Sequence, residues 1–194
     1  MDTRNKIINT ALKNFMSKGY EKTSLNEIVE ECNVSKGAFY HYFKNKEELF
    51  MEILMDMMKS IEKWTVKNVS SKTNFEGFLK AYFDFPMFFN ELGYELKVSV
   101  NMYRMMFDAM RIFPDLKKQF SETYKEHFKY IGAMMKDAQA KGEIRPDINV
   151  ENFAMASVVL VEGLILFEAI LEKENVVTSK TNAIAEEIWN LIKI

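Results

Sequence analysis

The segment from Thr23 to Leu49, which reads TSLNEIVEECNVSKGAFYHYFKNKEEL, constrains the fold of this chain more than any other. Ser24 and Glu27 form a capping box, which predicts the start of one short helix. Asn33 suits the left-handed conformation that commonly ends a helix, and Ser35 is a good N-cap for a second helix. The segment therefore predicts two short helices joined by a tight turn.

The second of these helices, predicted over residues 36–43, has one anchoring face. Phe39 and Phe43 lie one turn apart and can attach the helix to a core. The positions left available on other faces are Lys36, Gly37, Ala38, Tyr40, His41 and Tyr42. This pattern is typical of a helix-turn-helix, in which the second helix enters the major groove of DNA.

Charge is distributed unevenly around this motif. The whole chain has a net charge of -2, which does not by itself indicate a nucleic-acid binder. From Asn33 to Lys46, however, there are three lysines and no acidic residue. A local positive strip is enough to contact phosphates when the rest of the surface faces away. Charge alone favours the interpretation that these lysines form a solvated face. The helix-turn-helix pattern instead favours contact with DNA phosphates.

The run VSKGAFYHYFKNKEEL, from Val34 to Leu49, resembles the DNA-binding signature of TetR-family transcriptional repressors. A weaker similarity lies at Ala140 to Ile148, where AKGEIRPDI is similar to the segment joining the last two core-domain helices of many members. Between and after these segments the resemblance covers only length and helical rhythm. The resemblance implies an N-terminal DNA-binding head on a helical body that binds a ligand and forms dimers.

The chemistry of the head residues fits DNA contact. Lys36 can pair with guanine acceptors or a phosphate, and Gly37 allows close approach of the backbone at a helix N-terminus. Many family members carry His at the position of Tyr42, and here His41 comes one residue earlier. Core packing is the alternative for Tyr40 and Tyr42. The DNA-contacting set that the resemblance implies is Ser24, Asn26, Ser35, Lys36, Gly37, Ala38, Tyr40, His41, Tyr42 and Lys46.

Composition predicts a nearly all-α chain, because 194 residues contain 7 Gly and 3 Pro and so few helix breakers. We expect a three-helix head over residues 1–46 and a ligand-binding and dimerisation body over residues 47–194, with about nine helices in all. Thr73 is expected to cap the fifth helix, Pro86 to end or kink it, and Pro114 to stop the sixth. The remaining expected features are a first helix over 3–18, a break at 90–93, and helices over 94–111, 115–141, 149–174 and 179–193.

The body is rich in flexible and aromatic apolar residues. The chain holds 14 Met and 16 Phe, which suggests an interior that can repack around different apolar shapes. The alternative is an ordinary core, and the resemblance to ligand-gated repressors favours a pocket. The expected lining is Trp64, Tyr82, Phe85, Phe89, Met102, Tyr103, Met106 and Phe107. Candidates for orienting a ligand are Tyr82, Asn101, Tyr103 and Arg104.

The segment FAMASVVLVEGLILFEAIL, from Phe153 to Leu171, is apolar on nearly all sides. Such a helix is buried on more than one side, and we expect one side to meet a second copy of the chain. Glu162 can face the ligand, pair at the interface or lie on a solvent edge, and we prefer the edge of the interface. The expected dimer interface contains Val158, Glu162, Leu166, Ile184, Ile188 and Leu191.

Catalytic, metal and cofactor functions find no support in the sequence. The chain has two histidines without a second ligand at fixed spacing, and it lacks a nucleophile elbow, a phosphate loop and a C-x-x-C motif. For Cys32 a structural role is preferred to a redox sensor. A single cysteine suits the cytoplasm. Residues 1–6 lack the apolar core of a signal peptide, and the stretch 152–161 is too short to span a bilayer.

We therefore predict a cytoplasmic regulator without enzymatic activity, cofactor, metal or membrane partner. Its predicted partners are a double-stranded DNA operator, a small hydrophobic effector and a second copy of itself. The first alternative is a helical ligand-binding protein with a vestigial head that does not bind DNA. A small helical enzyme is the second alternative.

Overall fold

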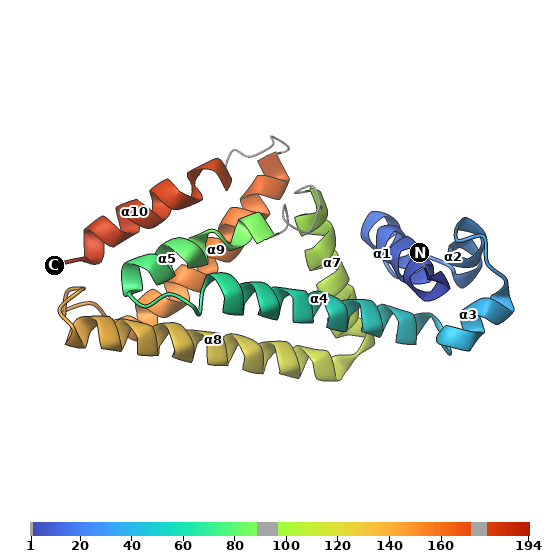
Figure 1. The fold of residues 1–194 in the computed structure, drawn as a ribbon, viewed down its shortest axis with the longest axis horizontal. Coiled ribbons are helices and arrows are strands. Elements are labelled where there is room, and N and C mark those ends of the chain that lie inside the picture. The colour runs from blue at the N-terminus through green and yellow to red at the C-terminus, as the bar shows by residue number, and fades with distance from the viewer. Residues whose placement is uncertain (1, 89–96, 172–177) are drawn as a thin grey trace. The chain divides into compact units, whose positions relative to one another are not determined.

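The computed structural model describes residues 2–88, 97–171 and 178–194, and these ranges contain no β-strand. The all-α prediction is confirmed, with nine α-helices in the described ranges (Figure 1). The helices are α1 (Thr3–Lys18), α2 (Leu25–Glu31), α3 (Lys36–Tyr42), α4 (Lys46–Asn68), α5 (Phe75–Phe83), α7 (Lys97–Ile112), α8 (Pro114–Ala140), α9 (Val150–Leu171) and α10 (Thr181–Ile192). Two short 3-10 helices are η1 (Phe85–Met87) and η2 (Thr178–Lys180).

Packing divides the chain into two compact units. The N-terminal unit comprises Met1–Ile61 and Val100–Leu116, and the C-terminal unit comprises Glu62–Ser99 and Lys117–Ile194. Helix α4 therefore begins in one unit and ends in the other. The N-terminal unit contains α1, α2 and α3 together with most of α7. The predicted functional division into residues 1–46 and 47–194 stays a prediction.

The N-terminal unit is built around one aromatic and aliphatic core. Phe15 meets Phe50 edge to face at 5.0 Å between ring centroids, which joins α1 to α4. Phe113, just beyond α7, stacks on Phe50 at 6.5 Å. The buried side chains contributed by the first four helices and their connections include Ile7, Ala11, Phe15, Ile28, Val29, Cys32, Phe39, Phe43, Leu49 and Phe50.

Polar contacts attach α7 to the turn between α1 and α2 within this unit. The Tyr20 N–H donates a 3.3 Å hydrogen bond to Oδ2 of Asp108. One turn further along α7, Arg111 pairs with Glu21 at 2.7 Å. Both Arg111 and Glu21 are more than half exposed, so this ion pair adds little stability by itself. The backbone contact to Asp108 is the more specific constraint, because it fixes one main-chain donor.

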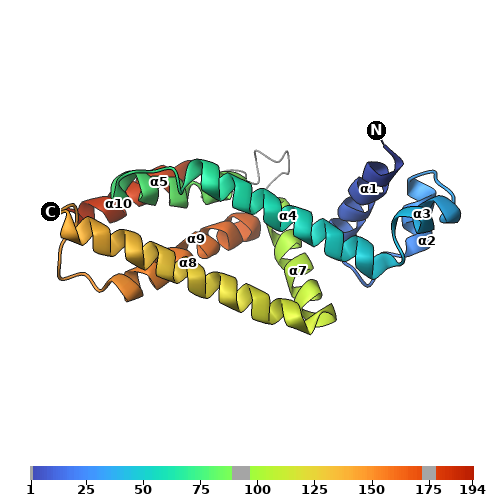
Figure 2. The same cartoon turned by 60° about the horizontal axis from the view of Figure 1, so that its bottom comes forward.

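In the C-terminal unit, α10 packs along α5, and the two helices lie side by side in both views (Figure 1 and Figure 2). The hydroxyl of Thr181 donates a 3.1 Å hydrogen bond to Oδ1 of Asp84. Burial raises the pKa of Asp84, and the hydrogen bond from Thr181 opposes that rise. This partly buried Thr–Asp contact thus fixes the start of α10 against the end of α5.

The segment from Ala140 to Ile148 forms the turn between α8 and α9 and holds the end of the chain. Gly142 takes a φ of 73°, which favours glycine. The Glu143 carboxylate accepts the first N–H of α5, from Phe75, at 3.1 Å. The Arg145 N–H donates to the Ile192 carbonyl at 2.8 Å. This turn therefore ties together α5, α8, α9 and the C-terminus.

Two boundary predictions were wrong in detail. Asn74, not Thr73, caps α5, because its Oδ1 accepts the Gly77 N–H at 2.8 Å. Pro114 is the first residue of α8 rather than a simple stop, since proline fits the first position of a helix, where its missing N–H is not needed. Pro86 falls in η1, just after α5, as expected. The predicted break at 90–93 and the predicted ends at 94 and 174 lie outside the described residues.

Helix α9 contains a stretch, Val150–Phe167, that is long and apolar enough to cross a membrane by length and composition. The stretch includes Glu151 and Glu162, so it is not apparent as an uncharged run in the sequence. A core helix of a water-soluble protein passes the same test, and a third of this stretch is buried inside the protomer. This helix therefore has more apolar surface than its own chain covers.

Candidate functional site

The helix-turn-helix forms as the sequence predicts, because its signals are local. The Ser24 hydroxyl accepts the Glu27 N–H at 3.1 Å, and the Ser35 hydroxyl accepts the Ala38 N–H at 3.1 Å. Asn33 adopts a left-handed φ of 52° in the turn between α2 and α3. Both predicted caps and the predicted turn residue are confirmed.

Helix α3 is anchored by one face and exposed on another. Phe39 and Phe43 are fully buried, with 5.7 Å between their ring centroids. Tyr40 is 56% exposed, which contradicts core packing as its main role. Tyr42 is half-buried and its ring meets His41 at 4.8 Å. The other predicted DNA contacts on the motif divide by burial into exposed Ser24, Asn26, Ser35, Lys36, Gly37 and His41, and half-buried Ala38.

The acidic residues of α2 are engaged by α1. Lys18 forms an ion pair with Glu27 and approaches Glu31 to 3.7 Å, and Asn14 donates a 3.0 Å hydrogen bond to Glu31. The hydrogen bond between Lys18 and Glu27 raises the pKa of Lys18 and lowers that of Glu27. Two of the three α2 carboxylates are thereby partly neutralised, which reduces their repulsion of DNA phosphates.

Lys46 has a structural role that the sequence did not indicate. Its ammonium donates 2.9 Å hydrogen bonds to the carbonyls of Tyr20 and Thr23, and it lies 4.0 Å from the centre of the Tyr20 ring. Burial lowers the pKa of Lys46 and raises that of Tyr20 to about 12. The predicted phosphate contact by Lys46 stays a prediction, with two of its three N–H groups already engaged.

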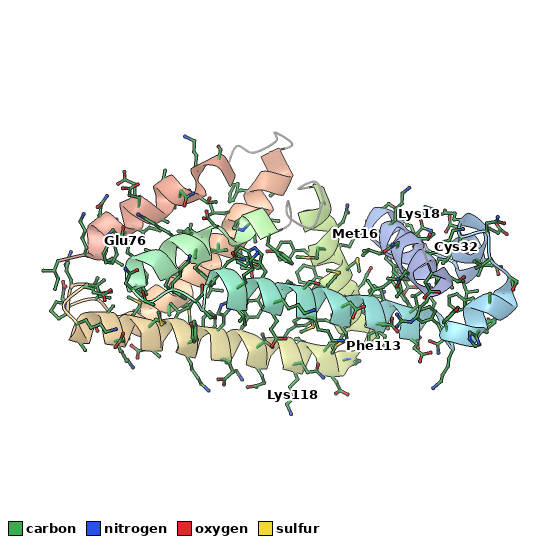
Figure 3. All side chains as sticks on the ribbon, in the orientation of Figure 1. Met16, Lys18, Cys32, Glu76, Phe113 and Lys118 are labelled. Atoms are coloured by element: carbon green, nitrogen blue, oxygen red, sulfur yellow. The ribbon has the colours of Figure 1, made fainter. Side chains whose placement is uncertain are left out.

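Cys32 ends α2 and is fully buried in the head (Figure 3). Its thiol donates a 3.5 Å contact to the Lys6 carbonyl on α1. A thiol without solvent access is a poor redox sensor. The structural interpretation of Cys32 is therefore the one that the geometry supports.

Three of the predicted ligand residues belong to the C-terminal unit. Trp64 and Tyr82 are 7% and 5% exposed, and Phe85 is half-buried. The rings of Trp64 and Phe85 meet edge to face at 5.5 Å. Phe88, which was not predicted as part of the pocket lining, is 3% exposed and meets Trp64 at 5.9 Å. Trp64, Phe85 and Phe88 thus form one aromatic group, called here the Trp64 cluster.

The C-terminal unit also contains a polar cluster that was not predicted from the sequence: Tyr82, Tyr124, His127 and Glu162. The Tyr124 hydroxyl donates a 2.9 Å hydrogen bond to Glu162, and the His127 ring meets the Tyr82 ring edge to face at 5.4 Å. Burial and then the charge of Glu162 raise the pKa values of Tyr82 and Tyr124. Burial lowers the pKa of His127, and Glu162 opposes that change. The i,i+3 spacing of Tyr124 and His127 on an otherwise charged helix was the available signal.

The other predicted ligand residues lie elsewhere. Met102, Tyr103 and Met106 belong to the N-terminal unit and are half-buried. Phe107 is 61% exposed, so its assignment to a buried pocket is corrected. Several neighbours of Phe107 on α7 are also apolar. Sequence periodicity therefore does not show whether Phe107 faces the core or the solvent. Phe89 lies outside the described residues.

Helix α9 has two apolar faces, as its composition predicted. One face is buried in the protomer through Ala154, Ser157, Val158, Val161 and Ile165. Val158 is 3% exposed, so its side chain is buried within its own chain rather than available to a dimer interface. Glu162 is half-buried and accepts the hydrogen bond from Tyr124, and its predicted place at the edge of an interface stays a prediction. The other face is exposed and is called here the α9 strip: Met155, Val159, Leu166, Phe167 and Ile170.

The α10 residues of the predicted interface vary in exposure. Leu191 is 70% exposed, whereas Ile184 and Ile188 are half-buried. A groove of about 340 Å³ beside α9 is lined by Phe128, Lys129, Gly132, Ala133, Lys136, Glu151 and Met155. Met155 belongs to both the groove and the α9 strip. In the described residues there is no group of three side chains suited to bind a metal ion.

Helix α3 is exposed on one face and is anchored by the buried rings of Phe39 and Phe43. This arrangement, in an all-α chain, is typical of the class of helix-turn-helix DNA-binding proteins. Residues 7–53 match the family described as "Bacterial regulatory proteins, tetR family". The regulator YuxN of Bacillus subtilis is 58% identical over 48 residues, covering 25% of this chain and 16% of YuxN. QacR of Staphylococcus aureus is 40% identical over 79 residues, covering 40% of this chain and 42% of QacR. The matches span less than half the length of either relative.

The fold of the whole chain also has a solved counterpart. A TetR-family transcriptional regulator from Cytophaga hutchinsonii superimposes with a TM-score of 0.72, over 99% of this chain and 95% of that chain, at 23% identity. At that identity the likeness shows the fold alone. The head match assigns residues 7–53 to the TetR family of bacterial regulatory proteins, and the solved counterpart shows that the whole chain shares the fold of such a regulator.

Proposed function

We propose that the protein is a cytoplasmic transcriptional repressor that binds a pseudo-palindromic operator as a homodimer. A small apolar or amphipathic molecule that binds the body releases it from DNA. The observation that carries the proposal is the exposure of Lys36, Gly37, Tyr40 and His41 on α3, opposite the buried pair Phe39 and Phe43. The family assignment supports DNA binding by this head.

The DNA contact rests on the chemistry at the start of α3. Lys36 and Gly37 are the first two residues of the helix, where free N–H groups and the helix dipole favour a phosphate. Tyr40 and His41 follow on the exposed side and offer a hydroxyl and a ring N–H to phosphates or bases. The pairing of Glu27 and Glu31 on α2 with α1 reduces the repulsion of DNA phosphates by the motif.

The homodimer rests on the α9 strip. Five large apolar side chains, each between 46% and 64% exposed, lie on one face of a single helix. Such a patch marks an interaction site in a water-soluble protein. A second copy is the occupant that the proposed function needs, because a two-fold dimer presents two reading helices to major grooves about 34–36 Å apart or a multiple of that. Leu191 on α10 is also exposed and is the second apolar residue that we propose for the interface.

The effector site rests on the C-terminal unit. Trp64, Tyr82 and Phe85 are apolar walls, and Tyr124, His127 and Glu162 of the polar cluster supply groups that can orient a ligand. Small-molecule sites typically combine a few polar groups with aromatic and other apolar side chains. The switch needs a coupling free energy of about 1–3 kcal/mol, which releases operator about 5–150-fold. We propose that α4 transmits it, because this helix begins in one unit and ends in the other.

The DNA half of the proposal is tested by selection from a random pool of duplex DNA, followed by binding measurements on the enriched sequence. An enriched inverted repeat is the expected result. Lys36→Ala and Tyr40→Ala should each weaken binding by about 1–3 kcal/mol at unchanged melting temperature. Lys59→Ala is the matched control, since Lys59 is an exposed lysine on α4 outside the motif. A pool without any enriched sequence would instead favour a ligand-binding protein whose head has lost DNA binding.

The effector half is tested with a panel of lipophilic cations, fatty acyl compounds and aromatic drugs. Binding in the body should change the fluorescence of Trp64, and Trp189 on α10 serves as the internal control through the variants Trp64→Phe and Trp189→Phe. Operator release is scored in the same samples by fluorescence anisotropy of labelled DNA. Compounds that bind without changing operator affinity would leave a ligand site and remove the switch.

A further inference from the structure

Trp64 carries an unusual polar group for its position. Its side chain is 7% exposed, and its indole Nε1–H has no hydrogen-bond acceptor among the protein atoms of the described structure. Four other buried polar side chains of the described ranges each donate a hydrogen bond within the chain. Asn14 donates to Glu31, Thr23 to the Gly19 carbonyl, Ser157 to the Phe153 carbonyl and Thr181 to Asp84.

The surroundings of Trp64 explain why the donor is left without a partner. The rings of Phe85 and Phe88 meet the indole edge to face at 5.5 and 5.9 Å, and they stack on each other at 5.8 Å. Carbon rings supply no oxygen or nitrogen acceptor. An N–H directed at a ring face recovers only part of what it loses on leaving water.

An orphaned buried donor costs free energy that a different residue would avoid. Burial removes the indole N–H from water, and the penalty remains until an acceptor replaces the water. Phenylalanine at position 64 would keep an aromatic ring beside Phe85 and Phe88 without any donor to satisfy. The chain instead places tryptophan in the Trp64 cluster, so an acceptor from outside the chain accounts for the choice.

We infer that the Trp64 N–H is the donor for a hydrogen-bond acceptor on the effector, which is an apolar molecule bearing a neutral carbonyl such as a ketone, ester or amide. This inference rests on the proposed effector site and names the ligand chemistry there. A neutral acceptor is favoured over a carboxylate because the ring walls of the Trp64 cluster offer no charge to replace the hydration of an anion. The apolar body of the ligand packs against Phe85 and Phe88.

The test compares molecules that differ only in the acceptor. The probes are 2-acetonaphthone and 2-isopropenylnaphthalene, and 2-undecanone and 2-methyl-1-undecene, in which a carbonyl oxygen is replaced by a CH2 group. Binding is measured by isothermal titration calorimetry on wild type, Trp64→Phe and Trp189→Phe. Each ketone should bind wild type and Trp189→Phe about five- to tenfold more tightly than its alkene, as one net hydrogen bond predicts.

In Trp64→Phe the ketone and its alkene should bind with about equal affinity, because the hydrogen-bond donor is lost. The alkene should keep its wild-type affinity, because an aromatic ring remains at position 64. Ultraviolet resonance Raman difference spectra between wild type and Trp64→Phe report the hydrogen-bonding state of the Trp64 indole directly. The expected spectrum is that of a non-bonded N–H without ligand and a bonded one with ketone. A bonded N–H in the free protein would mean that solvent satisfies the donor, and would overturn the inference.

Equal binding of ketone and alkene by wild type also overturns the inference, as does a ketone preference that survives Trp64→Phe or a failure of all four probes to bind. Operator release by the same probes scores the proposed switch separately. Equal binding with release would refute the donor role alone. Ketone-selective binding without release would refute the switch and leave the donor role intact.

Discussion

The ammonium of Lys46 lies 4.0 Å from the centre of the Tyr20 ring and donates a 2.9 Å hydrogen bond to the Tyr20 carbonyl. A second hydrogen bond of 2.9 Å reaches the Thr23 carbonyl. These contacts join the first turn of α4 to the turn between α1 and α2. The Tyr20 N–H, in turn, donates to Asp108 on α7. The α1–α2 turn is therefore held by α7 and by the first turn of α4, both within the N-terminal unit.

Replacing Lys46 by Met should destabilise the N-terminal unit by about 1–3 kcal/mol, because two buried carbonyls lose their donor and the ring loses its cation. Urea unfolding at equilibrium measures the effect. Lys44→Met is the control, since Lys44 is exposed and a surface change of this kind stays within about 0.5 kcal/mol. Unchanged stability together with weaker operator binding would restore the phosphate contact that the sequence predicted for Lys46.

Gly19→Ala should cost about 1–3 kcal/mol of stability, because Gly19 has φ 83° and ψ 166°, a region essentially reserved for glycine. A Cβ at this position would also overlap the guanidinium of Arg104, a flexible group that can move. Thermal and urea unfolding provide the measurement. Gly132→Ala in α8 is the matched control, as its Cβ would meet nothing within 4 Å, and it should be neutral or stabilising by up to about 1 kcal/mol. Equal effects of the two variants would refute the strain argument.

Leu166→Glu should convert the proposed dimer to monomer or aggregate and abolish specific operator binding. The charge falls in the α9 strip, where burial against a second copy would leave it unpaired. Sedimentation velocity at micromolar concentration measures the oligomeric state. Val66→Glu serves as the control, because Val66 is 60% exposed on α4, away from the strip, and the variant should stay dimeric. A wild-type monomer that still binds operator would overturn the dimer proposal.

Acidification should destabilise the protein in part through His127. Burial lowers the pKa of His127 below the ordinary value of 6.5, so the unfolded chain binds a proton first as pH falls. The contribution of neutral His127 is full above pH 6.5 and is lost as pH falls from that value through the lower folded pKa.

Melting temperatures of wild type and His127→Gln between about pH 7.5 and about pH 5.5 check this sign. The variant should lose less stability on acidification than wild type does. His41→Gln is the control, because His41 is exposed on α3 and its replacement should keep the wild-type pH dependence. A wild-type pH dependence in His127→Gln would show that the negative charge of Glu162 cancels the effect of burial.

The helix-turn-helix was predictable because every signal for it lies within a few residues. Ser24 and Ser35 cap their helices through N–H groups three residues ahead, and Asn33 turns the backbone by its own conformation. The first helix was predicted with the bounds that α1 has, since an amphipathic stripe and a final glycine mark both its course and its end. Asn74 was missed in favour of its neighbour Thr73 because both are good caps, and only the folded backbone selects one of them.

The sequence by itself determined the all-α class, the head motif and the presence of a helix with more apolar surface than one core can bury. Tertiary structure alone decided which side of α9 faces inward, placing Val158 in the core and Leu166 on the surface. Tertiary structure also places Glu162 beside Tyr124 and Lys46 beside its carbonyl acceptors. It leaves the Trp64 N–H without a hydrogen-bond acceptor in the chain. Capping and turn signals act between residues that are neighbours in the chain, so the sequence displays them. Burial and long-range hydrogen bonds depend on which helices pack together in the folded chain. Helix α9 is apolar on nearly all sides, so its sequence has no amphipathic pattern that shows which face is buried.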